Sequence, residues 1–160
     1  MKKDAITRKK RLRLKDFGYK GPYRYFITLC AFNKKQLFKD DMLVMRLVDI
    51  LREKAGHLGF RVRAWCFMPD HLHLLIEGKT PASDMRRFIS SYKQHTGFHY
   101  KKNAGLPLWQ VNFYEHVLRR EEDTITTVRY IFGNPVRKGI VDDYSKYKFS
   151  GSFEFDINDL

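Results

Sequence analysis

The stretch RVRAWCFMPDHLHLLI, at residues 61–76, determines the predicted fold of this chain. Residues 61–68 first alternate charged and apolar side chains and then become apolar, a pattern typical of a β-strand that enters a core. Pro69 and Asp70 are residues that favour a tight turn. Residues 71–76 show the strand pattern again. The stretch therefore predicts two successive strands joined by a tight turn at the centre of the chain.

Two histidines lie on one face of the second of these strands. Successive side chains of a strand point to opposite faces of the sheet, so His71 and His73 share one face and the apolar Leu72, Leu74 and Ile76 share the other. The apolar face belongs against helices, and we expect the histidines on the opposite, open face. Two imidazoles placed in this way can bind one metal ion. Because His-x-His is a weak motif by itself, a pair of surface histidines without a ligand is the alternative.

The rest of the chain indicates strands and helices in a definite order, placed by hydrophobic periodicity and by capping and breaking residues. The predicted elements are a strand at 25–30, a helix from 40–41 to Gly56 or Gly59, the strands at 61–68 and 71–76, a helix that begins at 83–84, a strand at 109–118, and a helix that begins at 121–123 and that Pro135 ends. The order β-α-β-β-α-β predicts an α+β protein with a ferredoxin-like, four-stranded antiparallel sheet and helices on one face. An additional helix follows towards the C-terminus.

Length and composition indicate one folded domain. The chain has 160 residues, of which 43% are apolar, and this is enough for one hydrophobic core. We expect a basic N-terminal arm at residues 1–20, a folded domain at 21–142, and a C-terminal tail at 143–160 whose position the sequence does not indicate.

The charge of the chain favours a polyanionic partner. The chain has 31 Lys and Arg residues against 18 Asp and Glu, and its formal net charge is +13. Such an excess suits a nucleic acid or an anionic membrane surface. No apolar stretch approaches the length of a membrane span, and the basic N-terminus has no apolar segment of a secretory signal. Cys30 and Cys66 each lie in an apolar run, so we expect reduced, buried thiols in a cytosolic protein.

Tyr130 is the second candidate for chemistry. On a helical wheel the apolar residues of the last predicted helix form one stripe: Ile125, Val128, Ile131 and Phe132. Tyr130 falls on the far side, with Asn134 one turn later on the same face. Core packing is the usual role of a helical tyrosine, but this helix already has its apolar stripe. A tyrosine close to a metal-bound phosphate can attack that phosphate, and a nucleic acid would supply one.

Three ordered blocks of the sequence resemble the REP-associated tyrosine transposases, a branch of the HUH single-tyrosine transposases of the insertion-sequence type. The blocks are Pro69–Leu75, Trp109-Gln110 with Phe113–Arg119, and Tyr130–Val136 with Gly139. The resemblance covers about residues 22–142, and the three ordered blocks together are far more specific than any one of them. The resemblance implies a ferredoxin-like fold whose additional C-terminal helix carries the nucleophile. It also implies nicking and rejoining of single-stranded DNA at hairpin-forming repeats through a 5′-phosphotyrosine intermediate.

The resemblance implies roles for individual residues. Tyr130 matches the catalytic nucleophile, and His71 and His73 match the pair that binds a divalent metal, Mg²⁺ or Mn²⁺. In the insertion-sequence relatives a glutamine four residues after the tyrosine is a metal ligand, and Asn134 occupies that place here. The shorter asparagine can still offer an oxygen to such an ion. His116 lies in a block that the family shares, and we expect a structural role for it.

Basic residues close to aromatic residues are candidates for DNA contacts, because they can neutralise phosphates while the aromatic rings stack on unpaired bases. The candidates are Lys9, Lys10, Arg11 and Arg13 in the N-terminal arm, and Arg86, Arg87 and Lys93 on the second predicted helix. A solvated helix face with buried aromatic rings is the alternative for each residue on the helix.

The expected function is metal-dependent nicking and strand transfer of single-stranded or hairpin DNA. We expect no membrane partner, a cytoplasmic and nucleoid-associated location in a bacterium, and either a monomer or a homodimer. Two other functions remain open at this point. One is a non-catalytic ferredoxin-like module that binds nucleic acid, and the other is a zinc-dependent hydrolase that uses His71, His73 and His116. Metal analysis and a search for a covalent protein–DNA product separate the three.

Overall fold

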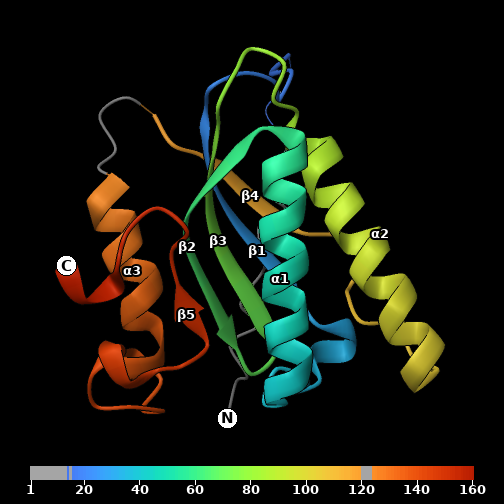
Figure 1. The fold of residues 1–160 in the computed structure, drawn as a ribbon, viewed down its shortest axis with the longest axis vertical. Helices are drawn as coiled ribbons and strands as arrows, with labels where there is room; N and C mark the ends of the chain where they lie inside the picture. The colour runs from blue at the N-terminus through green and yellow to red at the C-terminus, as the bar shows by residue number, and fades with distance from the viewer. Residues whose placement is uncertain (1–13, 15, 120–123) are drawn as a thin grey trace, which may run out of the picture.

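The structure, a computed structural model of the chain, describes residues 14, 16–119 and 124–160 (Figure 1). The strands are β1 (Arg24–Cys30), β2 (Phe60–Met68), β3 (His71–Gly78), β4 (Tyr114–Val117) and β5 (Ser150–Gly151). The helices are α1 (Asp41–Leu58), α2 (Met85–Ala104) and α3 (Thr124–Arg137), and the short 3₁₀ helices are η1 (Phe32–Lys34), η2 (Tyr144–Lys146) and η3 (Ile157–Asp159). The predicted order β-α-β-β-α-β followed by a helix is confirmed.

The strands form one antiparallel sheet in the order β4-β1-β3-β2-β5. β3 lies at the centre of the sheet. β1 pairs with it over the whole length of β1, from Arg24 opposite Glu77 to Cys30 opposite His71. The order of the first four strands is the ferredoxin-like arrangement that the sequence predicts. β5 joins the outer edge of β2 as a fifth strand, which the sequence does not predict.

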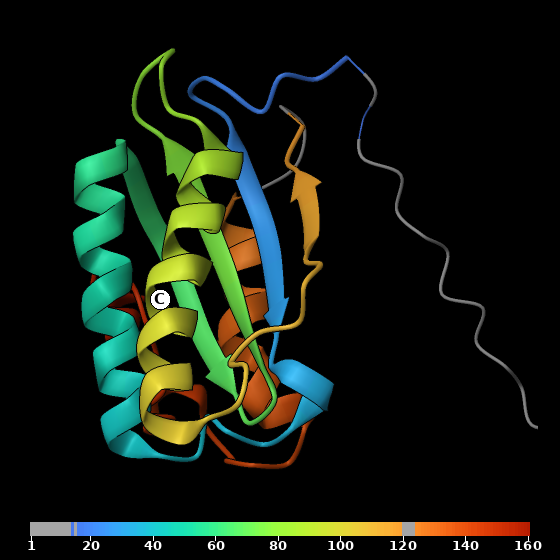
Figure 2. The same cartoon turned by 90° about the vertical axis from the view of Figure 1, so that its right-hand side faces the viewer.

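Helices α1 and α2 cover one face of this sheet and enclose the main core (Figure 2). The Asp40 side chain caps α1 by accepting a hydrogen bond from the Leu43 amide, and Gly59 ends the helix in the left-handed conformation, at φ 75°. In the same way, Asp84 caps the N-terminus of α2 and Gly105 ends the helix in the left-handed conformation. The apolar face of β3 points into this layer, as its sequence predicts.

Helices α1 and α2 thus share one face, as the sequence predicts, and the additional helix α3 packs on the opposite face, against β2 and β3 (Figure 2). Val128, Ile131 and Phe132 of α3 are buried in a second core with Cys66 and Met68 of β2. The physical reason is that β2 ends in residues that are apolar on both of its faces. The sheet face that carries the histidines is therefore partly covered rather than open.

Helix α3 does not end at Pro135, contrary to the prediction, but continues to Arg137. A proline lacks only the amide hydrogen of its own residue and disturbs the turn that precedes it. Here it lies close to the C-terminus of the helix, where the Ile140 amide donates to the Pro135 carbonyl at 2.9 Å. The proline therefore marks the last turn of the helix.

The segment before β4 and the C-terminal tail also differ from the predictions. The strand expected at 109–118 is shorter, because Trp109 is buried in the core and forms only an isolated bridge with Ala31. The tail forms η2, β5 and η3, and the Tyr147 hydroxyl donates to the Phe67 carbonyl of β2 at 2.6 Å. Within the part of the chain that the structure describes, no helix is long and apolar enough to cross a membrane.

Candidate active site

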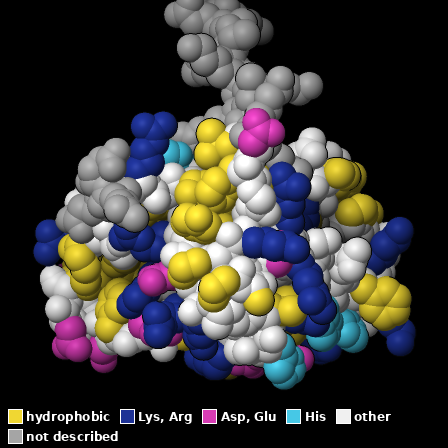
Figure 3. Space-filling model, turned by 90° about the horizontal axis from the view of Figure 1, so that it is seen from above, with side chains coloured by type: hydrophobic (Ala, Val, Ile, Leu, Met, Phe, Trp, Pro, Cys, Tyr) yellow, Lys and Arg dark blue, Asp and Glu magenta, His cyan; other side chains and the backbone are white. Residues whose placement is uncertain are grey.

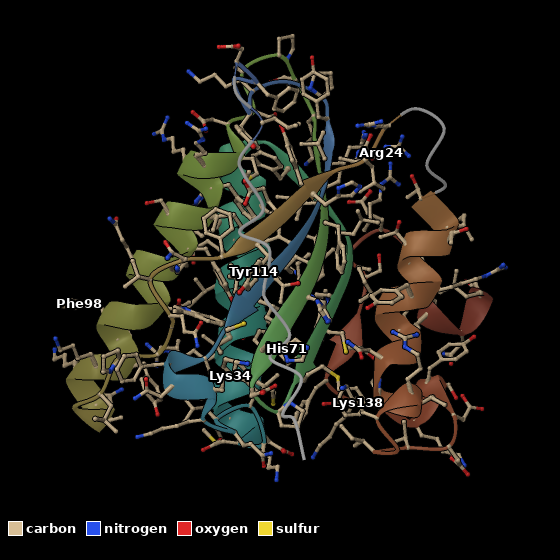
Figure 4. All side chains as sticks on the ribbon, turned by 180° about the vertical axis from the view of Figure 1, so that it is seen from behind. Arg24, Lys34, His71, Phe98, Tyr114 and Lys138 are labelled. Carbon is tan, nitrogen blue, oxygen red and sulfur yellow. The ribbon has the colours of Figure 1, made fainter. Side chains whose placement is uncertain are left out.

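His71 and His73 extend from β3 towards a common point. His71 lies on the sheet face that α3 partly covers (Figure 4). Their Nε2 atoms lie 3.1 Å apart, and their ring planes make an angle of 78°. His73 is buried and His71 is partly exposed. The two side chains share one face, as their spacing predicts, but they are more sheltered than the sequence indicates.

The Nδ1 atom of each imidazole lies within hydrogen-bonding distance of a neighbouring side-chain oxygen. Nδ1 of His71 lies 2.6 Å from a carboxylate oxygen of Asp70. Nδ1 of His73 lies 2.9 Å from the hydroxyl oxygen of Thr28, which is directly opposite it on β1. A carboxylate accepts a hydrogen bond, so His71 carries a proton on Nδ1 and keeps a lone pair on Nε2. Partners of this kind orient metal-binding histidines and select their tautomer.

The two Nε2 atoms fit a single divalent metal ion. Adjacent ligands of an octahedral ion, at about 2.1 Å from it, lie about 3 Å apart, and the Nε2 atoms are 3.1 Å apart. The Thr28 hydroxyl can accept as well as donate, so His73 can hold its proton on Nδ1 and present a lone pair on Nε2. Among residues 14, 16–119 and 124–160, no group of three or more His, Cys, Asp and Glu side chains could hold a metal. The zinc site with His116 as a third ligand is therefore not formed, and the remaining ligands would be water, phosphate or an amide oxygen.

Burial lowers the pKa of His73 to about 3, and the neighbouring His71 and Arg137 side chains act in the same direction. The imidazole is therefore neutral at neutral and mildly acidic pH. Neutral imidazole is the form that binds metal ions.

We expect the metal-free protein to lose stability in acid because of His73. The pKa of a histidine is 6.5 before burial and about 3 in the folded chain, so between these values the unfolded chain binds a proton that the folded chain does not. The free energy of unfolding should therefore fall as the pH drops through this window, by up to about 1.4 kcal/mol per pH unit. Urea unfolding at several pH values measures the slope. His73→Gln should reduce the slope, and His57→Gln, at an exposed position, should retain it; equal slopes in both variants would contradict the prediction.

Tyr130 lies on α3 beside these histidines. Its ring centroid is 6.5 Å from that of His73 and 5.9 Å from that of Phe26, which it meets edge to face. The guanidinium carbon of Arg137 lies 4.2 Å from the centroid of the Tyr130 ring, and the same side chain donates to the Tyr130 carbonyl. Half of the Tyr130 side chain is exposed, in agreement with its predicted place off the apolar stripe. The ring is thus held next to the histidines and remains accessible to a substrate.

Asn134 and His116 occupy different surroundings from Tyr130. Asn134 follows it by one helical turn but is buried, so the two do not share an exposed face as the helical wheel predicts. Its amide oxygen is therefore sheltered from water. His116 is on β4, opposite Phe26 of β1, and is partly buried. A ligand role for Asn134 stays a prediction.

The predicted DNA-binding residues of α2 have different environments. The Arg86 guanidinium lies 4.5 Å from the centroid of the Tyr19 ring, and Arg87 is exposed. Lys93 donates to the carbonyls of residues 110 and 111, and burial lowers its pKa. Its ammonium group is therefore used in contacts within the fold and is not free to bind a phosphate. Figure 3 shows the end of the molecule where α2 begins, with Lys and Arg side chains spread over it. Four candidates lie outside the described residues: Lys9, Lys10, Arg11 and Arg13.

Three residues that orient this site are missing from the sequence-based candidates. Asp70 could have been found, because a carboxylate directly before a metal-binding histidine is a plausible partner for it. Arg137 lies seven residues after Tyr130, two helical turns away on the same side, which is also a readable spacing. Thr28 has no local signal, because its place opposite His73 depends on the register between β1 and β3.

Comparison with known proteins identifies relatives of this chain. Residues 21–133 match the family described as Transposase IS200 like. A REP-associated tyrosine transposase of Escherichia coli K12 is 31% identical over 143 residues, which cover 86% of this chain and 80% of that protein. An uncharacterized protein of Haemophilus influenzae is 26% identical over 82% of this chain and 91% of its own length. A solved structure of a REP-associated tyrosine transposase bound to a REP hairpin has the same fold, with a TM-score of 0.70 at 24% identity over 87% of this chain and 81% of that one. The chain therefore belongs to the IS200-like transposases, in the branch of the REP-associated tyrosine transposases.

Proposed function

We propose that this transposase is a metal-dependent nickase and strand transferase of single-stranded DNA, with Tyr130 as its nucleophile and His71 and His73 as metal ligands. The observation that carries the proposal is the position of Tyr130, whose ring centroid lies 6.5 Å from that of His73. The opposed Nε2 atoms of the histidines support it, because their separation of 3.1 Å suits two ligands of one ion. Membership of a transposase family is independent support for DNA strand transfer.

The proposed reaction is a transesterification. The Tyr130 hydroxyl loses its proton and attacks the phosphorus, a bond forms between the tyrosine oxygen and the phosphorus, and the bond from the phosphorus to the 3′ oxygen breaks. The 3′ oxygen takes up a proton and leaves as a hydroxyl, so no external energy source is needed. In the second step a 3′ hydroxyl attacks the phosphotyrosine and releases Tyr130. A divalent ion, Mg²⁺ or Mn²⁺, bound by His71, His73 and Asn134 would polarise the phosphate.

The proposed substrate is single-stranded DNA beside a hairpin. The relative of solved structure is bound to a REP hairpin, and the net charge of +13 on this chain suits a polyanion. The test is incubation of the protein with Mn²⁺ and hairpin oligonucleotides taken from palindromic repeats of the host genome, followed by a denaturing gel. A covalent protein–DNA band is expected. Tight binding without any adduct would favour the non-catalytic DNA-binding module.

We also propose that one chain is sufficient for catalysis. Tyr130 and the two histidines lie close together within a single chain, and a hydrogen bond from the Arg24 side chain to the Thr124 hydroxyl ties the start of α3 to β1. This bond and the packing of α3 on β2 and β3 hold the helix over its own sheet. A tyrosine donated to a partner subunit would require these contacts to break.

Arg137 should affect the rate of attack by Tyr130. The Arg137→Ala variant removes the cation over the ring and the bond to the Tyr130 carbonyl, so the tyrosine loses its fixed orientation. We expect single-turnover adduct formation at saturating DNA to slow by about tenfold, which corresponds to about 1.4 kcal/mol in the barrier. The matched control is Arg129→Ala, an exposed arginine on the same helix, which should keep the wild-type rate. If Arg129→Ala slows adduct formation as much as Arg137→Ala does, the effect is one of charge and not of orientation.

The N-terminal arm should contribute to DNA affinity through charge alone. Deletion of residues 1–13 removes seven Lys and Arg residues and one Asp. For every phosphate that the shortened protein no longer neutralises, the slope of log K against log salt should decrease by about 0.7 on a single strand. Affinity titrations at several salt concentrations measure the slope, and circular dichroism confirms that the domain stays folded. An unchanged slope would mean that DNA binds to the folded domain only.

A further inference from the structure

A cavity of about 760 Å³ lies directly beside His71. Three segments that are distant in the sequence form its walls: residues 36–39 before α1, residues 68–71 at the turn between β2 and β3, and residues 138–149 after α3. The last of these lies beyond residues 21–133, the part that matches the family. The volume falls in the range of about 300–1,000 Å³ that is usual for small-molecule sites.

The floor of this cavity is apolar and its rim is basic. Aromatic and aliphatic side chains form the floor, among them Phe38, Val141, Tyr147 and Phe149. Four exposed lysines form the rim, Lys39, Lys138, Lys146 and Lys148, and the one carboxylate of the lining, Asp70, is held by His71.

Two of the rim lysines have no carboxylate partner within the described part of the chain. Lys146 and Lys148 form ion pairs with nearby aspartates. Lys39 and Lys138 form none with any described residue, so their charges remain available to an anion. Figure 4 shows Lys138 on one side of His71 and Lys34 of η1 on the other. The combination of an apolar, aromatic floor with free cations at the rim suits a flat aromatic ligand that carries a phosphate.

The cavity wall is built into the fold. The buried Tyr147 hydroxyl donates to the Phe67 carbonyl at 2.6 Å, and the Phe67 amide donates to the Phe149 carbonyl at 2.8 Å. β5 continues the attachment by pairing with β2. A ligand that enters would therefore find a formed site and would not have to order it first.

We propose that this cavity holds one unpaired nucleotide of the DNA strand, next to the phosphate that Tyr130 attacks. Its base lies on the apolar floor, where base–aromatic stacking contributes about 1–3 kcal/mol per base, and its phosphate lies between Lys39 and Lys138. This inference rests on the proposed function, because it takes the scissile phosphate to be at His71 and His73. His71 is one of the residues that line the cavity, so the nucleotide it holds would lie beside that phosphate. Occupation of the cavity places the strand in register with the nucleophile.

The test compares base-bearing with base-free DNA in a metal-free buffer. Fluorescence anisotropy measures the affinity for short dT, dC and dA oligonucleotides and for an abasic strand with the same number of phosphates. Ile140→Trp and Gln36→Trp place a large side chain in the cavity from opposite walls, and both positions are exposed, so the fold should tolerate them. The matched control is Met45→Trp, on the exposed face of α1.

The wild type should bind at least one base-bearing strand about tenfold or more tightly than the abasic strand. Both cavity variants should lose about tenfold in affinity for that strand and keep their affinity for the abasic strand, whereas Met45→Trp should behave as the wild type. Lys138→Ala should weaken both strands equally, because it removes a phosphate contact. A base preference that persists in both cavity variants would overturn the proposal.

Adduct formation keeps this inference distinct from the proposed function. If base preference depends on the cavity but no covalent adduct forms with Mn²⁺, the nucleotide site stands and the nickase proposal fails. If the adduct forms while the cavity variants bind all strands as the wild type does, the nickase proposal stands and the nucleotide site fails.

Discussion

The Tyr130→Phe variant should form no covalent adduct and leave single-stranded DNA uncut, while its affinity for that DNA stays within about twofold of the wild type. The substitution removes only the attacking oxygen. The ring, its contact with Phe26 and the arginine above it remain, so the free energy of unfolding should change by no more than about 0.5 kcal/mol. Denaturing gels measure the adduct, and anisotropy measures the affinity.

Tyr114→Phe is the matched control for this prediction. Tyr114 is also exposed and lies on the same sheet face, opposite Thr28 on β1 (Figure 4). Its variant should form adduct at the wild-type rate. Tyr92 of α2 is buried and donates to the Leu47 carbonyl, so it cannot reach a phosphate. An adduct that survives in Tyr130→Phe and disappears in Tyr114→Phe would move the nucleophile to β4.

The His71→Ala and His73→Ala variants should each reduce metal-dependent cleavage by a factor of at least about one hundred. Either change removes one of the two Nε2 ligands and leaves the other histidine unable to hold the ion alone. Hairpin DNA should still bind, because phosphate contacts supply most of the affinity. Rates measured across a Mn²⁺ titration, together with isothermal titration of the metal, distinguish a defect in metal binding from a defect in DNA binding. His57→Ala, on the exposed surface of α1, is the control and should cleave normally.

A mixture of Tyr130→Phe and His73→Ala proteins tests whether one chain supplies the whole site. Each variant lacks a different half of the proposed machinery. The distance within one chain between the Tyr130 and His73 rings predicts that the mixture forms no adduct. Recovery of adduct in the mixture would show that the tyrosine of one subunit serves the histidines of another.

The central hairpin shows how far the sequence predicts this fold. Residues 61–76 define two strands and the side on which each side chain lies, because a strand has a period of two. Asp40, Gly59 and Asp84 are capping residues that local chemistry explains, and the structure has them at those ends. The position of α3 does not follow from the sequence. It depends on the second face of β2, which is also apolar, and the pattern of a single strand does not indicate which of two apolar faces a given helix covers. β5 joins the edge of β2 through main-chain pairing, and its two residues carry no strand signal in the sequence.

The sequence likewise predicts some features of the site and not others. The shared face of His71 and His73 and the exposure of Tyr130 follow from local periodicity. The contact between Tyr130 and His73 does not, because it depends on how α3 lies across the sheet. Thr28 is likewise outside local reasoning, and so is the shelter that lowers the pKa of His73.

The short strands at the two edges of the sheet have a consequence for aggregation. β2 has nine residues, most of them buried and apolar, and such a strand at a free edge would be a template for pairing with another chain. β5 and the residues around it occupy that edge from Val62 to Phe67 through main-chain hydrogen bonds. At the other edge, β4 has only four residues. The C-terminal residues thus act as an edge protector, and a chain shortened to the residues that match the family would present the amides of β2 to its neighbours and precipitate.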